Sequence, residues 1–327
     1  MYSIDFVIPW VDGSDPAWIE TRNKYLENKE DGSPVRFRDW DNLQYWFRGV
    51  EKFAPWVNKI YFITWGHLPK WLNTNNPKLK VVKHEDYIPK EWLPTFSSHP
   101  IELNLHRIEG LSEYFVYFND DMFIINEMKE TDFFKNGLPC DSGIWNVHHS
   151  CRDKTSTITD NDMAVINDYF SKKEAIKRHF GKYFNFKYGR DNIRSGVLLA
   201  WPYWTGFLEC HFPNSFLKST LEEVWSKEPK LLSETSSHKF RNNMDVNQWL
   251  FRYWQLASGR FMPRSKKIAK YFPITEDNTA IVDAITKQKY KMICINDVAE
   301  LNDFEYQRDI IKQAFDKILP EKSSFEI

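Results

Sequence analysis

The chain has 327 residues, of which 42% are hydrophobic and 27% charged, and its net charge is −1. This composition is typical of a folded globular protein with a sizeable core, and the balanced charge excludes a general attraction to nucleic acid. No stretch approaches the roughly 20 apolar residues that a membrane-spanning helix needs. The four cysteines lack C-x-x-C spacing, so we expect reduced thiols in a cytoplasmic protein rather than a zinc site or a disulfide framework.

The first third of the chain alternates strand and helix signals, which is typical of a parallel α/β sheet. Ile4–Ile8 is an apolar strand that ends at a turn-forming Asp-Gly-Ser-Asp-Pro sequence, and Pro16 suits the first turn of a helix to about residue 28. Apolar residues at helical spacing predict an amphipathic helix over 39–53. Further strands are expected at 60–65, 79–83 and 114–118, with a helix at 100–111.

Helical patterns dominate from about residue 139. The fold class that this organisation predicts is α/β, with a GT-A- or Rossmann-like nucleotide-binding sheet and a mostly helical second half. We expect three regions: residues 1–138 form the α/β region, 139–280 the helical region, and 281–327 a strand and helix that pack back on the first. Helices are expected at 160–170, 172–180, 216–225, 245–256 and 303–318, and one more strand at 290–295.

The sharpest local signal lies at the end of the strand expected at 114–118, where Asn119, Asp120 and Asp121 follow. Ligands of open α/β sheets bind beyond the carboxyl ends of the strands. Adjacent carboxylates repel each other unless a cation lies beside them, and Mg²⁺ is commonly held by one or two carboxylates plus substrate phosphates. The aspartates therefore indicate a metal site, although a polar turn with an Asp helix cap fits the same residues.

Three polar residues precede this strand. Glu102, His106 and Glu109 are spaced to share one face of the helix expected at 100–111. This face either contributes to the site or is a solvated polar surface.

Further candidates lie in the second half of the chain. His211 is a candidate general base, because a histidine titrates near neutral pH, although a single histidine is more often structural. Arg241 is a candidate phosphate clamp, because its planar guanidinium matches two oxygens. Asp297 directly follows the strand expected at 290–295.

Two basic runs, at 172–194 and 260–270, stand out from the balanced background. A solvated helix face is the ordinary explanation, and an anionic acceptor or a membrane surface is the alternative. The 17% aromatic content, with 14 Trp, has a similar ambiguity. These side chains either fill the core or provide platforms for sugar rings.

The sequence resembles the Stealth family of hexose-1-phosphate transferases, which includes bacterial capsular polysaccharide phosphotransferases and the animal enzyme that starts the mannose-6-phosphate tag. The large insertions of the animal enzyme are absent, which favours the capsule-making branch. Four segments carry the resemblance in order: IDFVIPWVDGSDP from residue 4; RFRDWDNLQYWFRGVE from 36, with APWVNKIYFITWG from 54, LPTFSSHPIE from 93 and FNDD from 118; HFP from 211 with SHKFR from 237; and ICIND from 293 with PEKSSFE from 320.

The resemblance implies a UDP-sugar donor, Mg²⁺ (with Mn²⁺ as the alternative), nucleotide-sugar binding by residues 1–138 and acceptor binding by 139–280. The metal ligands that it implies are Asp120 and Asp121. The catalytic positions that it implies are Glu102, His211, Arg241 and Asp297. The substrate-binding positions are Trp10, Asp12, Gly13, Asp39, Arg48, Thr64 and Arg107.

We therefore expect transfer of a sugar-1-phosphate from a UDP-sugar to a hydroxyl of an oligosaccharide or capsule acceptor, with release of UMP. The main alternative is a GT-A-type glycosyltransferase, which would release UDP. A non-catalytic carbohydrate-binding protein is indicated only by the aromatic content. We expect no nucleic-acid partner. The sequence leaves open the donor sugar, the accepting hydroxyl, whether His211 or Glu102 is the base, the oligomeric state, and a peripheral contact with the inner face of the cell membrane.

Overall fold

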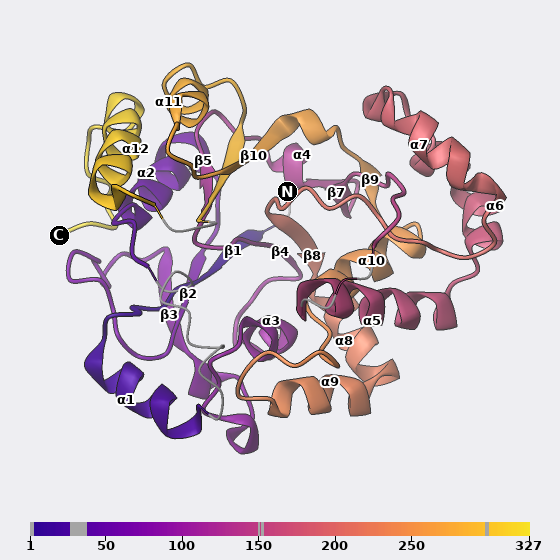
Figure 1. The fold of residues 1–327 in the computed structure, drawn as a ribbon, viewed down its shortest axis with the longest axis horizontal. Coiled ribbons are helices and arrows are strands. Elements are labelled where there is room, and N and C mark those ends of the chain that lie inside the picture. The colour runs from indigo at the N-terminus through magenta and orange to yellow at the C-terminus, as the bar shows by residue number, and fades with distance from the viewer. Residues whose placement is uncertain (1–2, 27–37, 150, 152–153, 298–300) are drawn as a thin grey trace.

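The computed structural model describes residues 3–26, 38–149, 151, 154–297 and 301–327. Its centre is a five-stranded sheet (Figure 1) that consists of β1 (Ile4–Pro9), β2 (Ile60–Thr64), β3 (Leu79–Lys83), β4 (Tyr114–Tyr117) and β8 (Asn214–Leu217). The strand order is β3-β2-β1-β4-β8, in which β8 is antiparallel to β4 and the others run parallel. Parallel strands in the order 3-2-1-4 are typical of doubly wound nucleotide-binding sheets, so the α/β prediction is confirmed.

Two smaller sheets flank the central one, with strand orders β10-β11-β5 and β6-β7-β9. Strand β5 follows β4 after a short turn, so the chain passes directly from the central sheet into the second sheet. The strands of the two smaller sheets are β5 (Met122–Ile124), β6 (Phe134–Lys135), β7 (Leu138–Asp141), β9 (Met262–Pro263), β10 (Ala269–Pro273) and β11 (Met292–Asn296).

Helices dominate the second half, as the sequence predicts. The expected end of the first helix, at residue 28, lies outside the described residues. No described helix combines the length and the apolar character needed to cross a membrane. The helices are α1 (Pro16–Tyr25), α2 (Leu43–Phe53), α3 (Ser98–Leu103), α4 (Glu130–Phe133), α5 (Lys154–Tyr169), α6 (Lys172–Tyr183), α7 (Asp191–Val197), α8 (Lys218–Lys227), α9 (Pro229–Ser237), α10 (Trp249–Ala257), α11 (Thr279–Thr286) and α12 (Phe304–Ile318).

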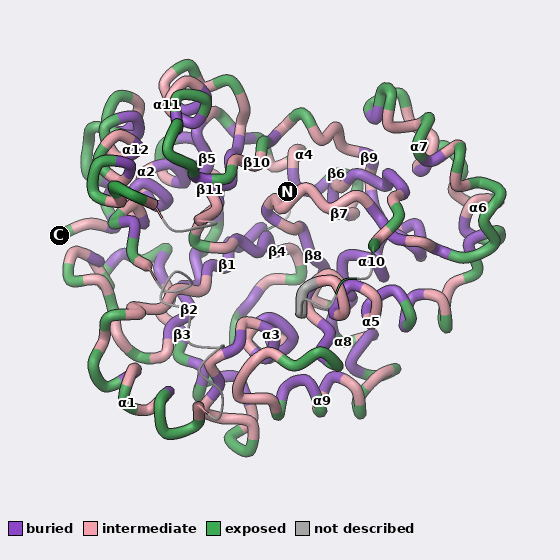
Figure 2. Tube along the Cα trace, in the orientation of Figure 1, coloured by how far each residue is buried: buried purple, intermediate pink, exposed green. Residues whose placement is uncertain are grey.

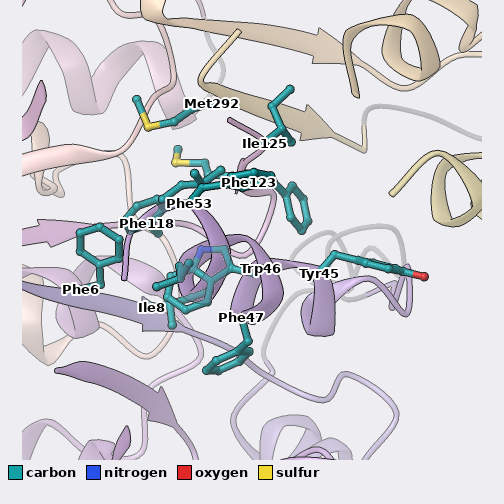
Figure 3. Packing of buried hydrophobic residues seen from close by; sticks show 14 of the residues in the cluster. Phe6, Ile8, Tyr45, Trp46, Phe47, Phe53, Phe118, Phe123, Ile125 and Met292 are labelled. Atoms are coloured by element: carbon teal, nitrogen blue, oxygen red, sulfur yellow. The ribbon is translucent and has the colours of Figure 1, made fainter. Parts of the chain in front are cut away.

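The alternation of side chains along the central strands divides the interior into two cores. Figure 2 shows that the central strands are mostly buried. In β1, Phe6 and Ile8 point into one core, which also contains residues of α2, α11 and α12. Val7 points into the other core, with residues of α5, α8 and α10. Figure 3 shows Phe6 and Ile8 beside Trp46 of α2, and the Phe6 and Trp46 ring centroids lie 6.5 Å apart. The central sheet is thus buried on both faces, and its strand ends remain for function.

The C-terminal residues return to α2. The ring of Phe315 in α12 stacks on Tyr45 with centroids 5.1 Å apart. Arg48 donates to both carboxylate oxygens of Glu326, at 2.8 and 2.7 Å. The division into three regions at residues 138 and 280 stays a prediction.

Two predicted elements differ from the structure. The helix predicted at 100–111 is wrong in length, because α3 ends at Leu103: the Asn104 amide donates to the Pro100 carbonyl at 2.8 Å and turns the chain. Glu102 is consequently buried and Glu109 exposed, so the predicted shared face with His106 does not form. Sequence patterns also predict a helix from residue 216, whereas 214–217 pair with β4 as β8.

Gly49 in α2 offers a test of how closely this helix packs on β5. A Cβ atom at Gly49 would lie 2.4 Å from the carbonyl oxygen of Ile124. Relieving this clash requires a shift of the β5 backbone, which costs free energy, so Gly49→Ala should lower the free energy of unfolding by ~1–3 kcal/mol. Urea denaturation measures this difference, as a shift in the midpoint urea concentration at an unchanged m-value.

The matched control is Gly196→Ala in α7, where no atom lies within 4 Å of the added Cβ. This variant should be unchanged or stabilised by up to about 1 kcal/mol, since alanine favours helix. Equal stabilities of the Gly49 variant and the wild type would contradict the close packing of α2.

Candidate active site

The acidic turn between β4 and β5 lies where the central sheet meets the second sheet. It contains Asp120 and Asp121, directly beyond the carboxyl end of β4. The backbone amide of Ile295 in β11 donates to the Asp121 carbonyl at 2.8 Å, and Met122 donates to Asn119 at 3.2 Å. Pairing with β11 therefore fixes the acidic turn at the position where α/β sheets bind ligands.

The Asp121 carboxylate is the centre of this site. Its Oδ2 atom lies 3.2 Å from the thiol sulfur of Cys294 and 3.6 Å from Nε2 of His211. Its Oδ1 atom is buried and accepts no hydrogen bond from any described residue. A buried carboxylate oxygen without a partner is costly, and an ion or a substrate would remove this cost.

Asp120 reaches solvent beside Asp121. The surrounding protein nevertheless removes much of its hydration, and together with the Asp121 charge this raises the pKa of Asp120 to about 7. Asp39 adds to this repulsion, so it lies within electrostatic range of the acidic turn. A divalent cation would relieve the repulsion among these carboxylates.

His211 approaches Asp121 from the loop before β8. Its backbone φ of 52° lies in the left-handed region, which a non-glycine residue occupies only when the surroundings enforce it. Burial alone would lower the pKa of His211, but the carboxylates of Asp121 and Glu209 outweigh this effect and raise it.

An ion pair in the interior holds the loop that carries His211. Arg252 of α10 donates to both Asp141 oxygens at 2.7 and 3.1 Å and to the Leu208 carbonyl at 3.1 Å. Glu209 and His211 line a pocket with a free volume of about 20 Å³, enough for one water but not for a sugar ring. Asp120, in contrast, is exposed on the solvent side of the acidic turn.

Buried carboxylates lie behind this loop. Glu102 accepts from the Tyr117 hydroxyl at 3.3 Å and from the Gln248 amide at 3.4 Å. Burial raises the pKa of Asp162 well above its usual range, and the Glu209 and Glu102 charges add to this effect. Burial also raises the pKa of Glu209, to about 7. Glu102 and Glu209 thus both lie within electrostatic range of Asp162, and the three form an acidic layer.

Arg241 lies in the loop between α9 and α10, where its guanidinium donates to the Ser98 hydroxyl at 3.3 Å. Asp245 fixes this loop, because its two oxygens lie 2.8 Å from Nδ1 of His99 and 2.6 Å from Nδ1 of His238. The network attaches Arg241 to α3, the helix that carries Glu102.

Asp297 follows β11 and accepts from Trp40 Nε1 at 3.1 Å, with Arg38 Nε at 3.6 Å. It thus connects the end of β11 with the residues before α2. Asp39 is exposed in that segment, adjacent to Trp40.

Three predicted nucleotide-binding residues gather at the ends of β1 and β2, around His67. The Asp12 amide donates to His67 Nε2 at 2.7 Å, and the Thr64 hydroxyl donates to the His67 carbonyl at 2.6 Å. The ring of Trp10 lies 5.3 Å from that of His67 and stacks on Phe62 at 5.8 Å. These residues lie at or beyond the carboxyl ends of two parallel strands, the edge of the sheet at which open α/β sheets bind ligands.

Gly13 lies in the same turn as Asp12, whereas two predicted arginines have other partners. Arg48 is paired with Glu326, as described above. Arg107 stacks on the Trp225 ring at 4.7 Å. The structure does not bring these two guanidinium groups to the strand ends.

Sequence reasoning overlooked four residues of the site. Cys294 is within a segment that carries the family resemblance, His67 directly follows another, and Glu209 lies two residues before His211, so this proximity is a signal that could have identified them. His148, with Nε2 3.8 Å from Glu209 Oε1, offers no comparable sequence signal.

Comparison with known proteins identifies the relatives of this chain. Conserved region 1 of the Stealth proteins matches residues 2–30, and conserved region 2 matches residues 36–140. Capsular polysaccharide phosphotransferase WcwK of Streptococcus pneumoniae is 46% identical, covering 100% of this chain and 98% of that protein. The chain belongs to the Stealth family. Within this Stealth protein, region 2 contains Glu102, Asp120 and Asp121.

Other full-length relatives agree with this assignment. Exopolysaccharide phosphotransferase cps2G of Lactiplantibacillus plantarum is 42% identical over 99% of this chain and 96% of its own length. Receptor polysaccharide phosphotransferase WefC of Streptococcus oralis is 41% identical over 100% of both chains. Among solved structures, the bifunctional glycosyltransferase WbbM has a TM-score of 0.42 at 10% identity and covers 96% of this chain and 50% of its own. Family membership rests on the sequence relatives.

The Stealth protein has side chains that could hold a divalent metal ion. Ligand atoms of Asp121, His211 and Cys294 all lie within 4.8 Å of one another. Oxygen ligands suit Mg²⁺ and Mn²⁺, whereas a thiolate suits zinc. The unpaired Asp121 Oδ1 atom and the adjacent Asp120 carboxylate could supply oxygen ligands for Mg²⁺ or Mn²⁺.

Proposed function

We propose that this Stealth protein transfers a sugar-1-phosphate from a UDP-sugar to a hydroxyl of an oligosaccharide or capsule acceptor, forming a phosphodiester and releasing UMP. The observation that carries the proposal is its full-length similarity, at 46% identity, to a capsular polysaccharide phosphotransferase. The acidic turn at the carboxyl end of β4 supports it, because its carboxylates could hold a divalent cation. Phosphate transfer needs such positive charge beside a diphosphate.

In this reaction the acceptor oxygen attacks the phosphorus that carries the sugar. The bond from this phosphorus to the bridging oxygen breaks, and UMP leaves with that oxygen. The bond between the sugar C1 and its oxygen is untouched, so the anomeric configuration of the donor is retained. The proton of the acceptor hydroxyl passes to a base of the protein.

Asp120 and Asp121 would hold Mg²⁺ or Mn²⁺ in this proposal, and the ion would neutralise the diphosphate. The unpaired Asp121 Oδ1 atom supports this role. Cys294 and His211 contact the other oxygen, Oδ2, so they would orient the carboxylate toward the ion.

His211 is the proposed base, and its location beside Asp121 supports this assignment. Glu102 is the alternative, but it is buried and already accepts two hydrogen bonds, which favours a positioning role. Arg241 would balance charge on the phosphate oxygens. Asp297 stays a predicted catalytic residue beside Trp40.

The carboxyl ends of β1 and β2, around His67, are the proposed site of the uridine nucleotide. Trp10, Asp12, Gly13 and Thr64 would line it, and Asp39 would contribute from the segment before α2. Arg48 and Arg107 would reach the donor only by leaving Glu326 and Trp225, respectively.

The metal proposal predicts that neither Asp120→Ala nor Asp121→Ala releases UMP, because the diphosphate loses its counter-charge. UMP release from a panel of UDP-sugars, with ³¹P spectra of the product, measures this. Asp309→Ala, at an exposed position of α12, is the matched control and should keep wild-type activity. Full activity in EDTA would refute the metal role. UDP as the product would instead indicate a glycosyltransferase.

Cys294→Ser tests which atoms bind the ion. If oxygen ligands hold it, the variant should bind Mn²⁺ as the wild type does in the presence of UDP, while Asp121→Asn should bind it weakly. Electron paramagnetic resonance of free Mn²⁺ measures both affinities without turnover. Loss of Mn²⁺ binding in Cys294→Ser would assign the thiol as a ligand.

His211→Ala should lower kcat by ~10²–10⁴-fold, because the acceptor proton loses its base. His149→Ala, which removes an exposed histidine, is the control. Circular dichroism confirms that both variants are folded. A loss of only a few-fold in His211→Ala would transfer the role of base to another residue.

A further inference from the structure

The segment from Lys172 to Tyr203, which we call the arm, lies at the edge of the molecule. It contains α6 and α7, which Figure 1 shows away from the central sheet. Of the 14 exposed large hydrophobic residues in the described part of the chain, seven lie in the arm. Monomeric proteins seldom gather so much apolar surface without a binding function. These seven residues are Phe180, Phe186, Ile193, Val197, Leu199, Trp201 and Tyr203, which are 46–87% exposed.

The arm is anchored, so its apolar side chains are presented outward. The Ser195 hydroxyl accepts from the Trp145 amide at 3.1 Å, which fixes the buried side of α7. Ile193 and Val197, two residues to either side of Ser195, lie together on the opposite side at 70% and 75% exposure. At the base of the arm, the buried Lys172 ammonium donates to the Leu198 and Trp201 carbonyls at 2.6 and 2.9 Å.

The same segment is strongly basic. Residues 172–203 contain eight Lys or Arg and two acidic residues, a net charge of +6 in a chain whose total is −1. Exposed cations lie near Ile193 and Val197: Arg194 belongs to α7, and Arg190 is the residue just before this helix. A groove of about 540 Å³ borders the arm at Lys187, and most of its charged residues are basic. These are Lys135, Lys187, Arg264, Lys267, Lys289 and Lys291, with Asp132 as the acidic one.

We propose that the arm docks the protein on an anionic lipid bilayer. Its aromatic and aliphatic side chains would enter the headgroup region, and its exposed cations, such as Arg190 and Arg194, would face the lipid phosphates. A second copy of the chain is the less favourable occupant, because a twofold contact through the arm would oppose two surfaces of charge +6.

The arm and the proposed active site are connected through the chain. The arm leads directly into the loop at 204–213, which carries Glu209 and His211. For a membrane-borne acceptor, docking of the arm would hold the enzyme at the surface where its acceptor lies. This link to catalysis rests on the proposed function, whereas membrane binding itself does not.

Vesicle flotation tests the proposal. The wild type should float with phosphatidylcholine vesicles that contain phosphatidylglycerol, and much less with phosphatidylcholine alone. Two double variants, Ile193→Ser with Val197→Ser and Arg190→Glu with Arg194→Glu, should each weaken binding by ~10-fold or more. The matched control is Tyr306→Ser with Lys317→Glu on α12, which changes an exposed aromatic and an exposed cation and should bind as the wild type does.

Wild-type binding in both arm variants, or no flotation of the wild type, would overturn the proposal. Light scattering tests whether a second copy of the chain covers the arm instead. A dimer that dissociates in the Ile193 and Val197 double variant, together with no vesicle binding by the wild type, would also overturn the proposal. UMP release with a soluble oligosaccharide acceptor should be unchanged in both arm variants. Because flotation needs no turnover, a failure of the proposed reaction would be seen separately.

Discussion

The site depends on one constraint, the position of the Asp121 carboxylate at the junction of two sheets. Its backbone belongs to the turn between β4 and β5 and pairs with Ile295 of β11. One of its oxygens contacts Cys294 and His211, and the other is buried without a partner. The protein thus keeps negative charge in a place where water cannot fully compensate it, which is the arrangement that a cation and a diphosphate would stabilise.

The rest of the structure maintains this arrangement. The two cores on either side of the central sheet prevent the strands from shifting and leave only their ends open. The Arg252–Asp141 ion pair holds the loop of His211, and the Asp245 contacts with His99 and His238 hold the loop of Arg241. Breaking such a buried pair leaves an uncompensated charge, so these contacts impose geometry on groups that otherwise lie on irregular loops.

Electrostatics separates two functional surfaces of the protein. The acidic turn and the layer behind its loop gather acidic side chains around the proposed transfer reaction, and burial raises the pKa of Asp120, Asp162 and Glu209. The arm concentrates positive charge and exposed apolar side chains at the edge of the molecule. A net charge of −1 hides both features, because it is the sum of opposite local excesses.

The sequence by itself determined the parallel strands, the amphipathic helix α2, the acidic pair and the family. Apolar runs bounded by turn residues, and apolar spacing along a helix, are local properties that need no knowledge of distant contacts. The segments that carry the family resemblance likewise led to the prediction that Asp120, Asp121 and residues around β1 and β2 serve the reaction.

Only the tertiary structure decided which distant groups complete that site. Cys294 reaches Asp121 across 173 residues of sequence because β11 pairs with β5. Arg48 is taken by Glu326 because the C-terminus returns to α2, and Asn104 ends α3 early through a side-chain hydrogen bond that periodicity does not reveal. Side-chain contacts between remote segments are settled by packing, and packing is a property of the folded chain as a whole.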